Sequence, residues 1–230
     1  MNAAGTGANG EKITIVSDGA ITTLTDVENY TVGDDSTNAR TITVSNAGTN
    51  VTANSATDAN TFNLGTLTYT GTLTGDNTVD DILSLNTGAN VSGGTITNVE
   101  ALTLTSGALI TLSATQNQNF TGTITAAGTG VSGEKITISG DGAVTALSNI
   151  ETYELGDDTT NARTLTTGSA ALNLIANNAS DTVTVNATAL AQNTALTLAA
   201  ASASALTVTS LVGDLVASNL SGTLAVTTAN

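Results

Sequence analysis

Apolar and hydroxyl-bearing residues alternate along most of this chain with a period of two. The segments KITIVS, RTITVS, GTLTYTGTLTG, DTVTVNA and ALTVTS place an apolar residue at about every second position, with Thr or Ser between them. Successive side chains of a β-strand point to opposite faces, so this alternation predicts strands with one buried and one solvent-facing side. No segment shows a convincing helical period, and the chain is therefore predicted to be all-β.

The predicted strands are short and are separated by Gly, Asn, Asp or Ser about every 8 to 12 residues. This spacing predicts a parallel β-solenoid (β-helix) of about ten short coils, each of roughly 18 to 25 residues. The alternative is a series of tandem β-sandwich domains, whose cores rely on large aromatic side chains. The chain has only three Tyr and two Phe. We therefore favour the solenoid, whose narrow interior Val, Ile, Leu and Ala can fill.

Internal repeats support one elongated repeat array over residues 1–230. Residues 3–43 match residues 126–166 without a gap at 27 of 41 positions, and a weaker copy spans 69–107. The tail, 167–230, is predicted to form further coils. A motif of the type [IL]-[ST]-[DN]-[VI]-Glu recurs in the three copies, at Glu28, Glu100 and Glu151. The last residues of the chain, followed by its first residues, resemble one continuous repeat. We therefore expect this chain to be a segment of a longer repeat array.

The charge balance excludes several classes of partner. A formal net charge of −15 repels nucleic acid and anionic membranes. No apolar run approaches the roughly 18 to 20 residues of a membrane span, so no membrane insertion is expected, and the first residues show no secretory signal. Open ends of a solenoid favour association with other copies, end to end or side by side.

Calcium is the cofactor that the composition permits. The chain has no Cys and no His, so only oxygen ligands remain for a metal ion. Carboxylates cluster in GDDSTNAR, GDNTVDD and GDDTTNAR, and the alternative is that each GDD forms a solvated turn at a coil corner. Arg40 and Arg163, the only arginines, are expected to neutralise the adjacent Asp pair or to bond turn carbonyls. The candidate calcium ligands are Asp34, Asp35, Asp76, Asp80, Asp81, Asp157 and Asp158.

Catalysis is not expected, because adjacent Asp residues on a strand point to opposite faces and do not form a catalytic pair. The Thr-x-Thr runs raise another possibility, a solenoid face that binds ice or polysaccharide. Ordinary solvent-facing strand threonines are the alternative. A flat row of Thr in register over at least four coils would favour the binding face.

The phrases GDNTVDDILSLNTGANVSGGTITNVEALTLT and ALTVTSLVGDLVASNLSGTLAVTTAN resemble those of bacterial RTX and S-layer-like secreted proteins. This resemblance implies type I secretion, an extracellular or cell-surface location and association with calcium. The tandem glycine-rich nonapeptide of the calcium β-roll is absent. We therefore expect a non-catalytic structural or adhesive segment of a secreted surface protein, self-associating and stabilised by calcium, with cell-surface polysaccharide as a further partner.

Overall fold

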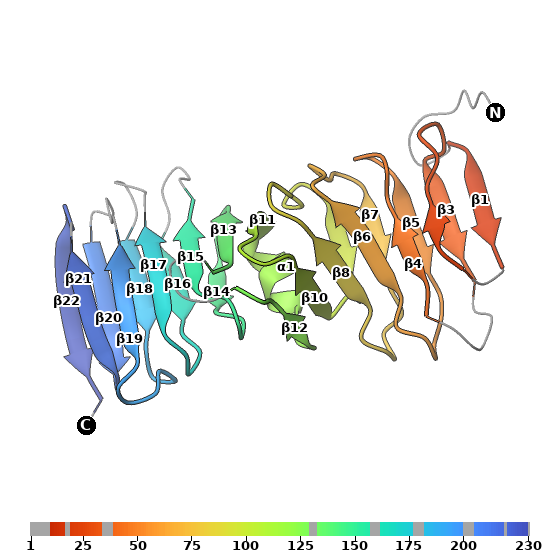
Figure 1. Ribbon diagram of the computed structural model, residues 1–230. Helices are drawn as coiled ribbons and strands as arrows, with labels where there is room; N and C mark the ends of the chain where they lie inside the picture. Colours follow the sequence, from red (N-terminus) through yellow and green to blue (C-terminus); the bar gives the residue numbers. More distant parts are fainter. Residues whose placement is uncertain are drawn as a thin grey trace. The chain divides into compact units, whose positions relative to one another are not determined.

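The structure is a computed structural model, and it describes residues 10–16, 19–33, 39–128, 133–156, 162–176, 182–199, 205–218 and 220–229. The chain divides into two compact units (Figure 1). Unit 1 comprises Met1–Thr105 and Asn119–Thr125, and unit 2 comprises Ser106–Gln118 and Ala126–Asn230. The chain therefore passes from unit 1 to unit 2, returns for one short segment, and passes to unit 2 again.

Two parallel sheets form unit 1. Both are parallel throughout their described strands, and consecutive strands of the chain alternate between them. Sheet A has the order β1 (Lys12–Ile15), β3 (Asn29–Val32), β5 (Asn50–Ala53), β7 (Thr72–Thr74), β9 (Thr95–Thr97). Sheet B has the order β12 (Ile124–Thr125), β10 (Ala101–Leu104), β8 (Ile82–Leu85), β6 (Thr61–Gly65), β4 (Thr41–Thr43), β2 (Ile21–Thr22).

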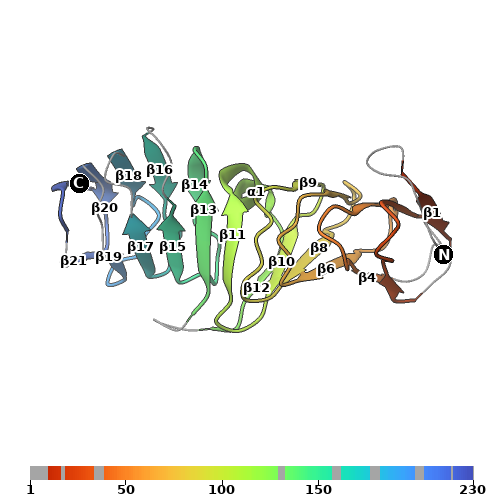
Figure 2. The same cartoon turned by 90° about the horizontal axis from the view of Figure 1, so that it is seen from above.

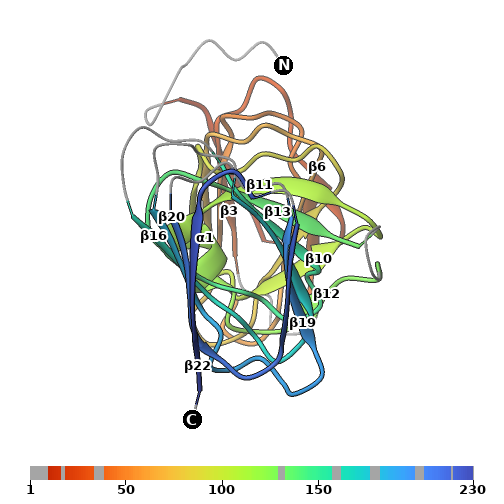
Figure 3. The same cartoon turned by 90° about the vertical axis from the view of Figure 1, so that its left-hand side faces the viewer.

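Unit 2 has the same plan, with two parallel sheets that form opposite walls when viewed along the stack (Figure 3). Sheet C has the order β11 (Leu109–Ser113), β13 (Lys135–Ser139), β15 (Thr152–Leu155), β17 (Leu172–Ala176), β19 (Ala195–Ala199), β21 (Asp214–Ser218). Sheet D has the order β14 (Ala143–Thr145), β16 (Arg163–Thr166), β18 (Thr182–Asn186), β20 (Ala205–Leu211), β22 (Thr223–Thr228).

Apart from β11 in sheet C and β12 in sheet B, where the chain passes between the units, each coil contributes two strands, one to each wall. Paired residues lie between 17 positions apart, as in Lys12 with Asn29, and 26 apart, as in Leu109 with Lys135. Between named strands of the described chain, every pairing is parallel. The predicted parallel β-solenoid is confirmed, and Figure 2 shows the successive coils of each unit from above.

The interior of each unit is built from columns of apolar residues that stack from coil to coil. In sheet A the register aligns Tyr30 with Val51, Val51 with Leu73 and Leu73 with Ile96, and all four side chains are buried. Burial of one such side chain contributes roughly 1.5 to 3 kcal/mol, so the narrow core stabilises the stack without many aromatic rings. The alternating sequence pattern is thus the direct cause of the two-walled coil.

One short helix interrupts the pattern. Helix α1 (Ala114–Asn119) follows β11 and precedes β12. Asn117 Nδ2 donates to the carbonyl of Thr145 at 2.8 Å, and Gln118 Nε2 donates to the carbonyl of Ala143. Both acceptors belong to β14, the strand at one end of sheet D, so the helix occupies hydrogen-bonding groups of that sheet edge.

The long repeat corresponds to the same local structure in both units. A shift of 123 residues carries β1 onto the first four residues of β13, β3 onto β15 and β4 onto the last three residues of β16. It also carries Tyr30, whose hydroxyl accepts the Leu24 amide at 2.6 Å, onto Tyr153, whose hydroxyl accepts the Leu147 amide at 3.0 Å. The two copies therefore keep side-chain contacts as well as strands.

Candidate functional site

Acidic residues gather at the corners that precede the strands. Glu28, Glu100 and Glu151, which the repeat motif singled out, lie directly before β3, β10 and β15. The first and last therefore begin strands of sheets A and C, whereas Glu100 begins a strand of sheet B. The weaker middle copy is thus placed on the other wall of the coil.

Each of these glutamates has an acidic neighbour one coil earlier. Glu11, Asp81 and Glu134 lie directly before β1, β8 and β13, the strands that pair with β3, β10 and β15. The Glu11 amide donates to Glu28 Oε2 at 3.1 Å, and the Glu134 amide donates to Glu151 Oε2 at 3.0 Å. We call the three sets Glu11–Glu28, Asp81–Glu100 and Glu134–Glu151 the acid pairs.

Two of the acid pairs consist of two glutamates, and of these Glu134–Glu151 is the more deeply buried. Glu134 is fully buried, and its Oε1 accepts the amides of Gly128 at 2.8 Å, Ala127 at 3.1 Å and Gly107 at 3.2 Å. Although burial opposes ionisation, these backbone bonds and a bond to the Glu151 carboxyl group lower the pKa of Glu134. Burial and the neighbouring Glu134 carboxyl group raise the pKa of Glu151.

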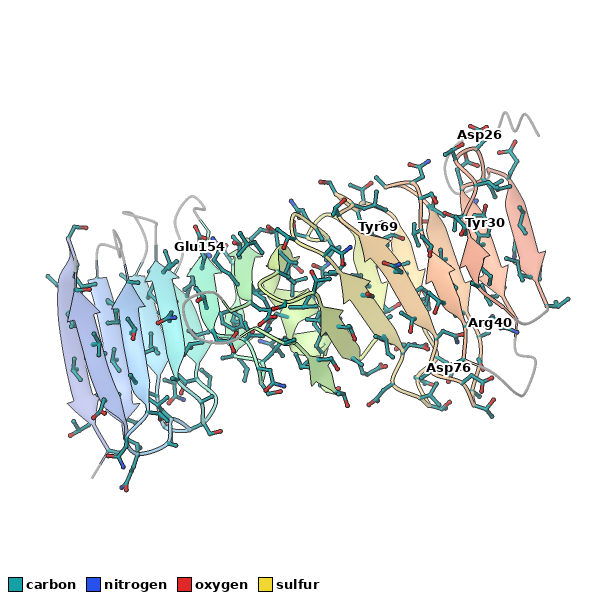
Figure 4. All side chains as sticks on the ribbon, viewed as in Figure 1. Asp26, Tyr30, Arg40, Tyr69, Asp76 and Glu154 are labelled. Carbon is teal, nitrogen blue, oxygen red and sulfur yellow. The ribbon has the colours of Figure 1, made fainter. Side chains whose placement is uncertain are left out.

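Asp81 belongs to a buried polar column in unit 1, and the half-buried Glu100 precedes the next strand of sheet B. This column runs along the starts of the sheet B strands: the Arg40 amide donates to Asn60 Oδ1 at 3.2 Å, and the Asn60 amide donates to Asp81 Oδ1 at 2.5 Å. Burial raises the pKa of Asp81 to about 6, although the amides of Asp76 and Asn60 oppose this shift. Figure 4 shows Arg40 and Asp76 on the same side of unit 1.

Arg40 and Arg163 are both buried at the start of a strand. Arg40 is 3% exposed and Arg163 is 2% exposed. Arg40 Nη1 donates to the carbonyl of Gly33, which confirms the expected bond to a turn carbonyl. The aspartates of both octapeptides, Asp34 with Asp35 and Asp157 with Asp158, lie outside the described residues.

The three described calcium candidates share one corner of unit 1. Asp81 Oδ2 accepts the Asp76 amide at 2.7 Å, and Asp76 Oδ1 accepts the Thr78 amide at 2.9 Å. Asp81 is fully buried whereas Asp80 is exposed, as expected for adjacent residues entering a strand. Within the described ranges, no group of three or more acidic side chains is arranged to hold a metal ion. The carboxylates of Asp76 and Asp81 instead accept backbone amides at the turn.

Threonines form an in-register column on the outer face of sheet A. The register pairs Thr14 with Thr31, Thr31 with Thr52, Thr52 with Thr74 and Thr74 with Thr97. We call these five residues the threonine column. The threonine column spans five coils, more than the four that would favour a binding face. Because β-branching restricts each side chain at χ1, the methyl and hydroxyl groups repeat at the strand spacing of about 4.8 Å.

Two surface hollows lie on the outer faces of the sheets. One, of about 270 Å³, is lined by Lys12, Asn29, Asn50 and neighbouring threonines of sheet A. The other, of about 370 Å³, lies over sheet C and contains Glu151 among Ala, Leu, Asn and Thr residues. Neither hollow brings two carboxylates together.

Sequence reasoning found Glu28, Glu100 and Glu151, and it named Asp81 as a calcium candidate. It did not predict that Glu11, Asp81 and Glu134 would each stand one coil before these glutamates. A signal for them was present, because GEKIT in both long copies and DDIL in the middle one place an acid directly before a strand. Burial of that acid depends on the next coil covering it, which a single repeat does not show.

No family model, curated protein or solved structure matches this chain. In the part of the chain that the structure describes, no helix is long and apolar enough to cross a membrane.

Proposed function

We propose that this chain is a non-catalytic structural or adhesive segment of a secreted bacterial cell-surface protein that associates with copies of itself. The observation that carries the proposal is the exposed edge strand β22 at the end of sheet D. Val226 on β22 is 42% exposed, and Val216 on the neighbouring end strand β21 of sheet C is 48% exposed. Edge strands of this kind offer unpaired amides and carbonyls to another chain.

The internal repeat indicates what such an edge would meet. Strand β13 pairs with β11 on one side and with β15 on the other, whereas its copy β1 stands at the end of sheet A and pairs with β3. Because β13 has nearly the same sequence as β1, the outer edge of β1 is suited to a parallel strand. Joining the β1 end of one molecule to the β22 end of another gives head-to-tail association.

Sedimentation and electron microscopy of the purified chain test this association. Replacing Val226 with Lys should abolish assembly, because Val226 continues the inward-facing column of the buried Val208 and a joining coil would bury the charge. Thr223→Lys, an exposed outward position on the same strand, is the matched control and should assemble normally. A wild-type chain that stays monomeric at every concentration contradicts the proposal.

Stabilisation by calcium is part of the same proposal. It rests on the acidic composition, on Asp34, Asp35, Asp157 and Asp158, and on the RTX-like resemblance, which also motivates the extracellular location. Melting curves in calcium and in chelator test it, because bound calcium stabilises the folded chain by mass action. Equal curves would remove calcium from the proposal and leave the structural role standing.

The threonine column supports a second candidate, a face that binds ice or polysaccharide. All three Tyr and both Phe side chains are buried, so the face has no aromatic ring on which a sugar could stack. Ice is therefore the better-supported ligand of the two. The fraction of protein that enters slowly grown ice measures this binding. Thr52→Lys should lower it and Ser84→Lys on sheet B should not, whereas binding to insoluble polysaccharide instead would favour the other ligand.

A further inference from the structure

We propose that Glu134 and Glu151 are a proton-sharing carboxyl pair that latches one corner of unit 2 and releases it as the pH rises. The proposal goes beyond the structural role proposed above. It rests on the geometry around two described glutamates, neither of which is a calcium candidate.

Glu134 joins three separate parts of the chain. Its Oε1 holds Gly107 in the turn before β11, and Ala127 with Gly128 in the segment that leads towards β13. Its own carbonyl accepts the Thr152 amide at 3.1 Å at the start of β15. Loss of the Glu134 carboxylate from its position would therefore free the entry to β11 and the entry to β13 together.

The second oxygen of Glu134 needs a proton donor. Glu134 Oε2 is buried and has no hydrogen-bond partner among the described residues. Glu151 Oε2 accepts the Glu134 amide at 3.0 Å, which places the Glu151 carboxyl group next to Glu134. One proton on Glu151 satisfies both groups, whereas two ionised carboxylates repel each other at a site with little water to screen them.

Glycines leave room for the pair. A Cβ atom at Gly128 would lie 2.7 Å from Glu134 Oε2, and a Cβ atom at Gly133 would overlap the Glu151 carboxyl group. Gly133 and Glu134 have counterparts in Gly10 and Glu11 of unit 1, where the Glu11 amide bonds Glu28 Oε2 in the same way. The arrangement is therefore a repeated feature of the fold.

Other charges on the surrounding elements are already engaged. On β13 and β15 the titratable side chains are Lys135, Tyr153 and Glu154. Lys135 forms an ion pair with Glu154 on the outer face of sheet C, and the Tyr153 hydroxyl bonds Asn117 Oδ1 inside the unit at 3.0 Å. In the turn at 106–108, in residues 126–128 and in β17 the described residues carry no titratable side chain.

The direction of the pH effect follows from the two glutamates. Because the pKa of Glu151 is raised, its contribution to stability is complete below the ordinary glutamate value and is lost as the pH rises through the raised pKa. Because the pKa of Glu134 is lowered, its contribution is lost only when the pH falls through that lowered value. The corner is therefore closed between the two pKa values and opens above that of Glu151.

Amide hydrogen exchange at Gly107, Ala127 and Gly128 tests the latch. Protection factors, corrected for intrinsic exchange, should fall in the wild-type chain as the pH rises above the usual range of glutamate pKa values. Glu151→Gln keeps a proton donor at every pH, so its protection should stay high. Glu154→Gln, an outer-face acid on the same strand, should retain the wild-type pH dependence.

A second measurement needs no variant. Side-chain carboxyl carbon resonances of ¹³C-labelled wild-type protein should show one glutamate of the pair titrating below, and the other above, the usual glutamate range. Unchanged protection across the pH range, or wild-type pH dependence in Glu151→Gln, overturns the proposal, as does ordinary titration of both carboxyl groups.

Discussion

At the scale of single residues, several polar side chains inside this solenoid form hydrogen bonds with the backbone. Tyr153 is fully buried, yet its hydroxyl accepts the Leu147 amide at 3.0 Å and donates to Asn117 Oδ1 at 3.0 Å. Arg40 bonds the Gly33 carbonyl and Asp81 accepts two amides. An unbonded buried group costs about 1 to 3 kcal/mol, so these contacts account for polar residues inside a narrow core.

Tyr153→Phe measures one of these contacts with little change in volume. The substitution leaves the Leu147 amide and Asn117 without their hydroxyl partner, so the free energy of unfolding should fall by about 1 to 3 kcal/mol. Chemical denaturation followed by circular dichroism checks this value. Thr115→Ala, at an exposed position of α1, is the control and should change stability little. Equal stability of Tyr153→Phe and wild type would contradict the assignment.

At the scale of elements, the corners between strands set the spacing of the coils. Gly75 follows β7 and its amide donates to the Thr97 carbonyl at 3.0 Å in the next coil. A Cβ atom at Gly75 would overlap the Asn98 carbonyl and the Asp81 carboxylate. Gly48, in another turn of unit 1, has no atom within 4 Å of the place a Cβ would occupy. The backbone therefore approaches closely enough to require glycine at Gly75 but not at Gly48.

Gly75→Ala should destabilise unit 1 by about 1 to 3 kcal/mol, because the overlapped atoms include backbone that must shift. Gly48→Ala should be neutral or slightly stabilising, since it restricts the unfolded chain without a steric conflict. Thermal unfolding of both variants beside the wild type provides the comparison. If Gly75→Ala has the same melting temperature as Gly48→Ala, the close backbone approach at Gly75 does not limit the spacing of the coils.

Element type was predictable from the sequence, whereas the wall on which an element lies was not. Alternation of apolar residues with Thr and Ser is a local property that correctly predicted strands, and the spacing of these short strands correctly predicted parallel coils. The position of Glu100 on sheet B instead of sheet A depends on how many half-coils precede it, which local similarity to Glu28 does not reveal. Helix α1 has six residues, too few to establish a helical period. Burial of Glu134 and Asp81 arises from neighbouring coils and was likewise not predicted.

At the scale of the whole molecule, the acidic charge opposes the association that the open edges favour. A formal net charge of −15 makes two copies repel at low ionic strength. Raising the ionic strength from about 0.01 M to 0.15 M shortens the Debye length from about 30 Å to about 8 Å. At the higher ionic strength, charge repulsion therefore opposes the pairing of edge strands from two copies less strongly.

Assembly should therefore increase with salt in this range, because screening weakens repulsion between copies more than it weakens backbone pairing. Sedimentation velocity at fixed protein concentration and two salt concentrations measures the change. Val226→Lys should remain unassembled at both. Assembly that falls as salt is added would indicate contacts between opposite charges as its cause.

The path of the chain between the units also determines how the molecule can be divided. Strand β11 and most of α1 belong to unit 2 although they precede β12 of unit 1. A single backbone cut after Thr125 would leave β11 on the first fragment, while its partner β13 stays on the second. The cut would divide sheet C alone: the first fragment would carry β11 without the rest of that sheet, and the second would carry sheet C without β11. A strand on one fragment that completes a sheet on the other is the arrangement required for fragment complementation.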